Sequence, residues 1–317
     1  MGQSPAEPSV PLLHGGPVAF AGEPGAFAED AVIAAFGPDV QRHAVGSFLD
    51  VFRAVTEGRA GSGMLPIENL LNGTVRENLD LLLEHELVVI GEVVVPVRLS
   101  LAALPGQTLD DIERVYSHIQ ALGQAEAFLR SRPWTTLTTY NTAGAGRIVR
   151  DAGEHGAAAV LSPRAAALFG LEVLASDIQG GADNRTRFLV VGTDPGAEAS
   201  IDESGEGTPG AGEGTPGAGE GTPGAGRPWR TTVAFAVRNE PGTLLHALRA
   251  FADRGVNLSS LESRPSRTAA WEYVFWADVD AASGEPACAA ALDDLHGVST
   301  MVRILGSYPR ATESIGS

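Results

Sequence analysis

The residues best suited to chemistry form a short run, Asn184-Arg185-Thr186-Arg187-Phe188. Thr186 has a hydroxyl that can donate a hydrogen bond, and an arginine stands on each side of it. A guanidinium group pairs with carboxylates through two parallel hydrogen bonds. In an acidic chain this pattern favours a site for an anionic substrate. The alternative, a charged surface around a buried threonine, stays open on these residues alone.

Other polar residues follow predicted strands. Glu68 and Asn69 come after the strand expected over residues 60–66, where α/β proteins place ligand contacts. Ser117 and Gln120 open a helix expected over residues 117–130. Ser117 suits an N-cap as well as a ligand contact, and His118 is interpreted as a hydrogen-bonded structural residue. No cysteine or carboxylate spacing is typical of a metal site, so no metal is predicted.

The composition excludes several classes of protein. All 22 basic residues are arginine, against 39 acidic residues, and the net charge is −17. Without lysine there is no P-loop lysine and no Schiff-base lysine, and the single cysteine, Cys288, excludes an internal disulfide. An acidic chain is a poor partner for nucleic acid or an anionic membrane. No apolar run is long enough for a membrane span, so we expect a cytoplasmic protein.

A repeat divides the chain of 317 residues. Residues 205–211, 212–218 and 219–225 each read Gly-Glu-Gly-Thr-Pro-Gly-Ala, which has nothing to bury and predicts a flexible linker over residues 194–228. The linker separates a large domain, residues 17–193, from a small one, residues 229–310. We expect residues 1–16 to be a disordered tail and residues 311–317 a second tail. Each repeat also matches G-x-G-x-x-G, but no strand precedes it, which disfavours a dinucleotide site and a Rossmann dehydrogenase.

The large domain alternates the two periodicities. Strand-like stretches lie at 17–21, 60–66, 87–95, 137–140, 157–161 and 186–192, and helical ones at 25–36, 48–57, 75–85, 117–130, 143–151 and 164–169. This alternation predicts an α/β fold with a mostly parallel sheet.

The small domain reads β-α-β-β-α-β, the ferredoxin-like order. Its strands are expected at 231–237, 257–264, 272–278 and 302–307, and its helices at 243–254 and 286–296. The sheet leaves a face or an edge available for pairing. A module of this size behind a linker suggests a regulatory domain.

Taken in order, the motifs resemble the prephenate dehydratase family, including its arogenate dehydratase relatives. The segments that carry the resemblance are Gly22-Glu23-Pro24-Gly25-Ala26-Phe27, Leu65-Pro66-Ile67-Glu68-Asn69, Ser117-His118-Ile119-Gln120-Ala121-Leu122, Thr186-Arg187-Phe188, Gly242-Thr243-Leu244-Leu245, Glu262-Ser263-Arg264-Pro265 and Leu305-Gly306-Ser307-Tyr308-Pro309. Departures such as Ile119 and Asn141 leave the Thr-Arg-Phe motif intact. The resemblance implies two α/β lobes, as in a type 2 periplasmic binding protein, followed by an ACT domain. Lobe 1 should comprise residues 17–95 and 178–193, and lobe 2 residues 96–177.

The resemblance also implies the reaction and the residues that serve it. Thr186 should be catalytic and assist the departing hydroxyl of prephenate, with no cofactor. The substrate-binding residues are expected to be Arg187, as a carboxylate clamp, with Phe188, Glu68, Asn69, Ser117, Gln120 and Thr142.

The small domain should bind the effector L-phenylalanine in a homodimer or homotetramer. Its expected contacts are Gly242, Thr243, Leu244, Asn257, Leu258, Glu262, Ser263, Arg264 and Pro265. Two other functions stay open. One is dehydration of arogenate, and the other is a non-catalytic, amino-acid-responsive binding protein built from the same lobes.

Overall fold

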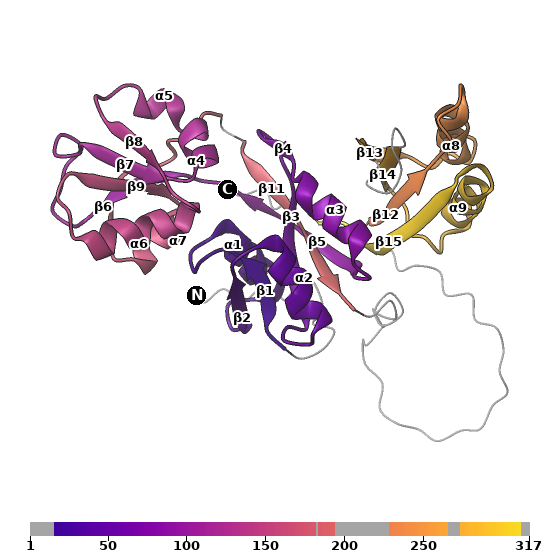
Figure 1. Ribbon diagram of the computed structural model, residues 1–317, viewed down its shortest axis with the longest axis horizontal. Coiled ribbons are helices and arrows are strands. Elements are labelled where there is room, and N and C mark those ends of the chain that lie inside the picture. The colour runs from indigo at the N-terminus through magenta and orange to yellow at the C-terminus, as the bar shows by residue number, and fades with distance from the viewer. Residues whose placement is uncertain (1–15, 182, 194–227, 266–272, 312–317) are drawn as a thin grey trace, which may run out of the picture. The chain divides into compact units, whose positions relative to one another are not determined.

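The computed structural model describes residues 16–181, 183–193, 228–265 and 273–311 and shows two compact units. The described residues up to Thr193 belong to the first unit, and those from residue 228 onward belong to the second. The predicted N-terminal tail, the repeats of the linker and the C-terminal tail lie outside the described residues, except at their edges. Figure 1 labels the helices and strands of both units.

The first unit begins with a six-stranded sheet in the order β2-β1-β3-β11-β5, with β4 paired to β3. Buried side chains of α1 pack on one face of this sheet, against β1, β5 and β11, while α2 contacts β1 and β3 and α3 contacts β3. The strands are β1 (Val18–Ala21), β2 (Arg42–Val45), β3 (Ser62–Asn69), β4 (Gly73–Thr74), β5 (Val88–Pro96) and β11 (Arg185–Gly192), and the helices are α1 (Phe27–Phe36), α2 (Phe48–Thr56) and α3 (Arg76–Glu84).

The second sheet of the first unit has five strands in the order β10-β6-β9-β7-β8. Alternate residues of the fully buried β9 face opposite ways, Ala158 and Val160 toward α4 and α5, and Ala159 and Leu161 toward α6 and α7. The elements are β6 (Ser100–Ala103), β7 (Arg114–Ser117), β8 (Thr135–Thr138), β9 (Ala157–Leu161), β10 (Glu172–Ala175), α4 (Ile119–Gln124), α5 (Glu126–Leu129), α6 (Thr142–Ala152) and α7 (Pro163–Leu168). Figure 1 shows the chain passing to this lobe after β5 and returning through β11.

The α/β class is confirmed, but the expectation of a mostly parallel sheet is wrong. Strands β1, β2 and β3 are parallel, whereas β11 runs antiparallel to both β3 and β5. In the second sheet β7 is parallel to β8 and β9, while β6 is antiparallel to β9 and β10. The reason is the crossing between lobes. β5 leads out of lobe 1 and β11 leads back beside it, so the two must run in opposite directions.

The helix expected over residues 117–130 is also wrong in its extent. It is replaced by the short helices α4 and α5, and residue 117 belongs to β7. The backbone carbonyl of Gln124 accepts a hydrogen bond from Gly180 N at 2.7 Å, at the position where a continuous helix bonds to its own next turn. Strands β2, β6 and β10 are four residues each and gave no alternating pattern long enough to predict.

The second unit is an antiparallel sheet of four strands in the order β13-β14-β12-β15. Helices α8 and α9 share one face of it, where Val233, Phe235, Ala277 and Val279 pack against them. The bounds are β12 (Trp229–Ala236), α8 (Thr243–Ala252), β13 (Leu258–Pro265), β14 (Tyr273–Val279), α9 (Pro286–Val298) and β15 (Met301–Pro309). The predicted β-α-β-β-α-β order is therefore observed. Cys288 of α9 is free and buried, and burial raises the pKa of its thiol.

Within the described ranges no helix has the length and apolar character needed to cross a bilayer. The same ranges contain no group of three His, Cys, Asp or Glu side chains placed to hold a metal ion.

Candidate active site

A cavity of about 570 Å³ lies between the two lobes of the first unit. Four helices of at least nine residues begin at its wall, namely α1, α2, α3 and α6. The first turn of a helix presents backbone N–H groups and the positive end of the helix dipole, so several such ends around one cavity favour an anion. The first turns of α1 and α3 have no capping side chain, and Asn141 caps α6 by accepting a hydrogen bond from Gly144 N.

Thr186, the predicted catalytic residue, lines this cavity and is 8% exposed. Its hydroxyl oxygen accepts a hydrogen bond from Asn69 Nδ2 at 2.9 Å. The amide of Asn69 cannot be reversed, because its Oδ1 accepts from the backbone N–H groups of Leu71 and Asn72 at 3.1 and 3.0 Å. A backbone N–H only donates, so the Nδ2 side must face Thr186. The threonine proton is left to donate to another group.

The contact between Asn69 and Thr186 belongs to a longer hydrogen-bonded chain. Asn69 Nδ2 also donates to Asn184 Oδ1 at 2.8 Å, and Asn184 Nδ2 donates to Gln124 Oε1 at 3.1 Å. Gln124 lies on α4 in the second lobe and also lines the cavity. The chain of amides thus extends from the second lobe to the threonine hydroxyl and fixes its orientation.

Five predicted site residues lie in the cavity wall: Thr186, Phe188, Asn69, Gln120 and Thr142. Thr186 and Phe188 are two residues apart on β11 and share a face of the strand, as the period of a strand requires.

The structure does not bring Arg187 into the cavity wall. This corrects the prediction that Arg187 is a carboxylate clamp. Arg187 lies between Thr186 and Phe188 and points to the other face of β11. There it pairs with Glu92 at 3.3 Å and with Glu68 at 3.5 Å, and the Glu92 side chain is only 1% exposed. Glu68, also predicted to bind substrate, is therefore held on the same side and is not in the cavity wall.

The prediction that Ser117 binds substrate is also corrected. It is fully buried, and its hydroxyl donates to the carbonyl of Val160 at 2.6 Å, which ties β7 to β9. It does not line the cavity and does not cap α4. The cap is His118, whose Nδ1 accepts from Gln120 N at 3.4 Å.

Several cavity residues were missed by the sequence reasoning. His118 lines the wall, and its burial lowers the pKa of its imidazole, which favours the neutral ring. Arg76, Tyr140 and Ser162 also line the wall. Each stands at or next to the start of a helix, and this was the signal that could have found them.

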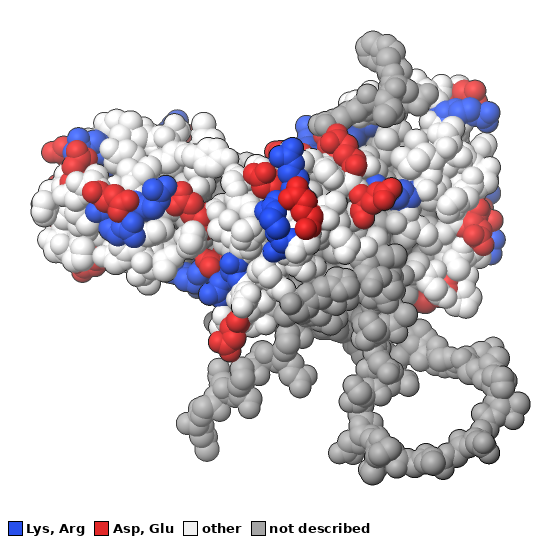
Figure 2. Space-filling view, turned by 60° about the horizontal axis from the view of Figure 1, so that its bottom comes forward, with Lys and Arg blue, Asp and Glu red and all other residues white. Residues whose placement is uncertain are grey.

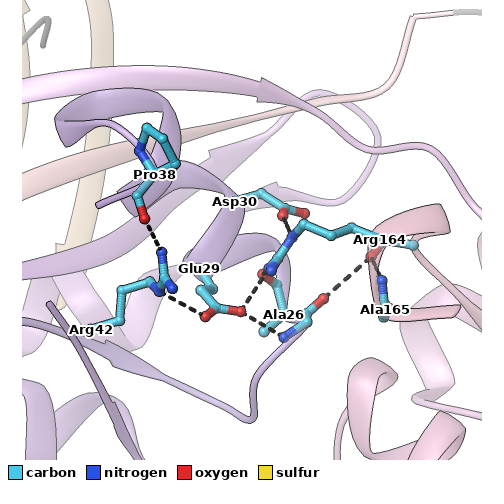
Figure 3. Close-up of polar contacts among 9 residues, drawn as sticks. Ala26, Glu29, Asp30, Pro38, Arg42, Arg164 and Ala165 are labelled. Carbon is cyan, nitrogen blue, oxygen red and sulfur yellow. Dashed lines mark hydrogen bonds and ion pairs between the residues drawn. The ribbon is translucent and has the colours of Figure 1, made fainter. Parts of the chain in front are cut away.

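The two lobes are joined beside the cavity by charged contacts, drawn in Figure 3. Arg164 of α7 donates to the Glu29 carboxylate at 2.7 Å and also bonds to Asp30, both on α1. Glu29 is 6% exposed and also pairs with Arg42 at 3.1 Å. Burial raises the pKa of Asp30 and outweighs the opposing attraction of Arg164.

A second contact joins the same lobes. Arg147 of α6 binds Glu23 through two hydrogen bonds of 2.8 Å each. Hydrogen bonding from Arg147 lowers the pKa of the Glu23 carboxyl. Figure 2 shows that such pairing is common on the surface, because the arginines on the face in view lie beside acidic side chains.

The register of the second unit separates the predicted effector residues into two groups. Arg264 and Ala236 are both paired with Val274, so the turn at Gly242 and the run Glu262 to Pro265 lie at one end of the sheet. The turn holds Gly242, Thr243 and Leu244, and Gly242 has φ of 87°, which favours glycine. Asn257 and Leu258 lie at the opposite end, where Asn257 donates to Asp280 at 2.7 Å.

The fold and the cavity define a class of protein. Two α/β lobes around a cleft, with a β-α-β-β-α-β unit after them, are those of a two-lobed, binding-protein-like catalytic domain with an ACT domain. The family models agree, since the one described as prephenate dehydratase matches residues 18–196 and the one described as ACT domain matches residues 231–297. The chain belongs to the prephenate dehydratase family.

Individual relatives carry more than one activity in their names. The chain is 36% identical to arogenate dehydratase 5 of Arabidopsis thaliana over 92% of its own length and 67% of that protein. It is similar to the prephenate dehydratase of Arthrobacter aurescens, solved in complex with L-Phe, with 32% identity, coverage of 95% and 92%, and a TM-score of 0.76. It is also similar to GqqA, described as a novel type of quorum quenching acylase, with 32% identity, coverage of 93% and 98%, and a TM-score of 0.78.

Proposed function

We propose that this chain is a prephenate dehydratase that converts prephenate to phenylpyruvate, carbon dioxide and water. One observation carries the proposal: the Thr186 hydroxyl accepts from Asn69 at 2.9 Å inside a cavity where several helices begin. That arrangement combines a hydrogen-bond donor for a leaving oxygen with backbone groups suited to two carboxylates.

The chemistry asks little of the protein beyond holding and polarising the substrate. The electron pair of the bond to the ring carboxylate moves into the ring as carbon dioxide departs, and the bond to the ring hydroxyl breaks. The hydroxide that leaves takes up a proton and becomes water, and the ring becomes aromatic. Thr186 donates its hydrogen bond to this oxygen as negative charge develops on it. A threonine hydroxyl is a weak acid, so the proton itself is relayed from water.

Binding in a single conformation supplies the rest of the acceleration. The carboxylates are expected against the first turns of α1, α3 and α6, which line the cavity and present backbone N–H groups. Phe188 and Phe27 in the wall pack against the ring. Fixing the substrate in this way removes much of the entropic cost of reaching the transition state.

We propose L-phenylalanine as the effector, bound by the second unit at the Gly242 turn and the end of β13. A relative with 32% identity was solved with L-Phe, and the ACT family model covers this unit. Phenylalanine is chemically the transaminated product, so the effector would report the output of the reaction through a conformational equilibrium.

Dehydration of arogenate is a second candidate, because arogenate dehydratase 5 is 36% identical to the chain. Prephenate and arogenate differ only in a keto or amino group on the side chain. The test is to incubate the purified full chain with each substrate and to measure phenylpyruvate by its absorbance and phenylalanine by chromatography. Higher kcat/KM with prephenate supports the proposal, and higher kcat/KM with arogenate replaces it. No turnover with either, together with retained phenylalanine binding, would leave a non-catalytic binding protein.

The similarity to GqqA suggests an acylase activity as another candidate function. Acyl transfer needs a nucleophile beside a general base. The Thr186 hydroxyl accepts a hydrogen bond from the neutral amide of Asn69, and His118 Nδ1 accepts one from Gln120 N. This geometry favours dehydration. Hydrolysis of an N-acyl amide by the same preparation, at rates above those of dehydration, would reverse that order.

We further propose that the protein acts in the cytoplasm as a homodimer or homotetramer. The buried, free Cys288 suits a reducing compartment. Strands β13 and β15 are the edges of the second unit's sheet and can pair with another copy. Light scattering on an eluting chromatographic peak measures the oligomeric state, and a monomer would contradict this part.

A further inference from the structure

The cavity contains a positively charged residue that the motifs did not indicate. Arg76, the first residue of α3, lines the wall, and it is the only lysine or arginine among the described lining residues. The chain has no lysine and a net charge of −17, so a side chain with a permanent positive charge in this cavity must be an arginine.

The other arginines near the cavity have different positions. Arg147, Arg164 and Arg187 each form an ion pair with a glutamate of this chain. None of the three lines the cavity. The role that the family resemblance suggested for Arg187 therefore needs another residue.

The position of Arg76 connects it to the catalytic threonine. β3 and β4 form a short antiparallel pair in which Asn69 is opposite Gly73, three residues before Arg76. Asn69 in turn donates to Thr186. The start of α3 is thus held in register with the residue that orients the threonine. No side chain caps this helix start, so its N–H groups and the guanidinium favour an anion at the same place.

We propose that Arg76 binds the carboxylate of the substrate's side chain, the one that survives the reaction. The inference rests on the proposed dehydratase function and gives it a residue for substrate binding. The ring carboxylate is the less suitable partner, because it must leave as carbon dioxide. A guanidinium paired with it would stabilise the ground state more than the transition state and would slow the reaction.

Steady-state kinetics on the full chain test the proposal. Arg76→Gln should raise KM for the substrate about tenfold or more and leave kcat within about threefold, the pattern of lost uniform binding. Arg76→Lys should recover much of the loss, because it keeps the charge but not the bidentate geometry. Arg130→Gln is the control for net charge, since Arg130 is 79% exposed on the surface beside α5 and should leave KM unchanged.

Phenylpyruvate distinguishes the two carboxylates, because it keeps only the one on the side chain. We expect Arg76→Gln to weaken phenylpyruvate binding, measured by calorimetric titration, in proportion to the rise in KM. An unchanged KM overturns the proposal. A raised KM with unchanged phenylpyruvate affinity also overturns it, because Arg76 would then contact the ring carboxylate. If the unmodified chain turns over neither prephenate nor arogenate, the proposed function fails, and the titration still decides whether Arg76 binds a carboxylate.

Discussion

Asn69 holds the hydroxyl of Thr186 as a hydrogen-bond acceptor, with Nδ2 and Oγ1 2.9 Å apart. A hydroxyl that accepts in this direction has its own proton available for a different partner. Since Thr186 faces the cavity, that partner can be the leaving oxygen of a substrate. The catalytic role proposed for the threonine therefore depends on a neighbour that does no chemistry itself.

We predict that Thr186→Ala lowers kcat by about 10²-fold or more, the low end for loss of a group that assists proton transfer, with a small change in KM. Thr186→Ser keeps a hydroxyl and should retain most of the activity. Asn69→Ala should lower kcat about tenfold and leave KM nearly unchanged, as expected for an interaction that matters most in the transition state. Initial rates over a range of substrate concentrations measure both constants. Near-normal kcat for Thr186→Ala would remove the threonine from the mechanism.

The ion pair behind β11 leads to a prediction on stability. Arg187→Leu should lower the free energy of unfolding by about 3–5 kcal/mol, because it leaves the buried charge of Glu92 without this arginine. Denaturant unfolding measures this change. The double variant Arg187→Leu with Glu92→Leu removes both charges and should recover most of the loss. A large rise in KM for Arg187→Leu, without loss of stability, would contradict this structural role and indicate that Arg187 binds substrate.

Some of the site could be predicted from the sequence, and the reason lies in where each residue stands. Asn69 and Thr186 follow or open long, well-marked strands, and such positions were enough to place them at the cleft. Arg187 was misplaced because neighbouring residues of a strand point to opposite faces, and the motif alone does not say which face is the cleft. Ser117 was misplaced because its hydroxyl finds a backbone partner, Val160, on a strand far away in the sequence.

The fold shows the same division between local and distant information. The β-α-β-β-α-β order of the second unit follows from periodicity within each segment. The direction of β11 does not, because it is decided by pairing with β3 and β5, which lie about a hundred residues earlier. Arg76 was overlooked because a lone arginine before an amphipathic helix resembles ordinary surface charge. Its position becomes informative only in three dimensions, where Arg76 lies at a cavity at which several helices begin.

The contact between the lobes should affect substrate binding. Arg164→Leu removes the cross-lobe partner of Glu29 and Asp30, and we expect it to raise KM about tenfold by favouring an open cleft. Arg42→Leu is the matched control, because Arg42 pairs with the same Glu29 at 3.1 Å from within the first lobe. Both variants should lose stability, about 1–3 kcal/mol for a charged hydrogen bond, but only Arg164→Leu should change KM. Equal changes in KM for the two variants would show that the contact of Arg164 with Glu29 and Asp30 has no role in closing the cleft.

The pair of Glu23 and Arg147 predicts a dependence of stability on pH. Hydrogen bonding from Arg147 holds the folded pKa of Glu23 below its ordinary value of 4.5. The stabilisation is therefore fully present above the unfolded pKa and is lost as the pH falls through the lower, folded value. Thermal unfolding followed between about pH 6 and pH 3 should show a shallower fall in Tm for Glu23→Gln than for the unmodified chain. Parallel curves for the two proteins would mean that the pair contributes nothing.

The second unit is expected to carry the effector site. Removing residues 227–317 should abolish the response to L-phenylalanine, and inhibition that persisted in the shortened chain would place the effector site elsewhere. A finer test uses two glycines with positive φ, Gly242 at 87° before α8 and Gly255 at 69° after it. Alanine at either position strains the backbone by about 1 kcal/mol. Only Gly242 lies at the predicted effector site, so we expect Gly242→Ala to raise the half-inhibitory phenylalanine concentration about tenfold and Gly255→Ala to leave it unchanged. Because the two changes carry the same strain, equal responses would show that the effect comes from loss of stability and not from the effector site.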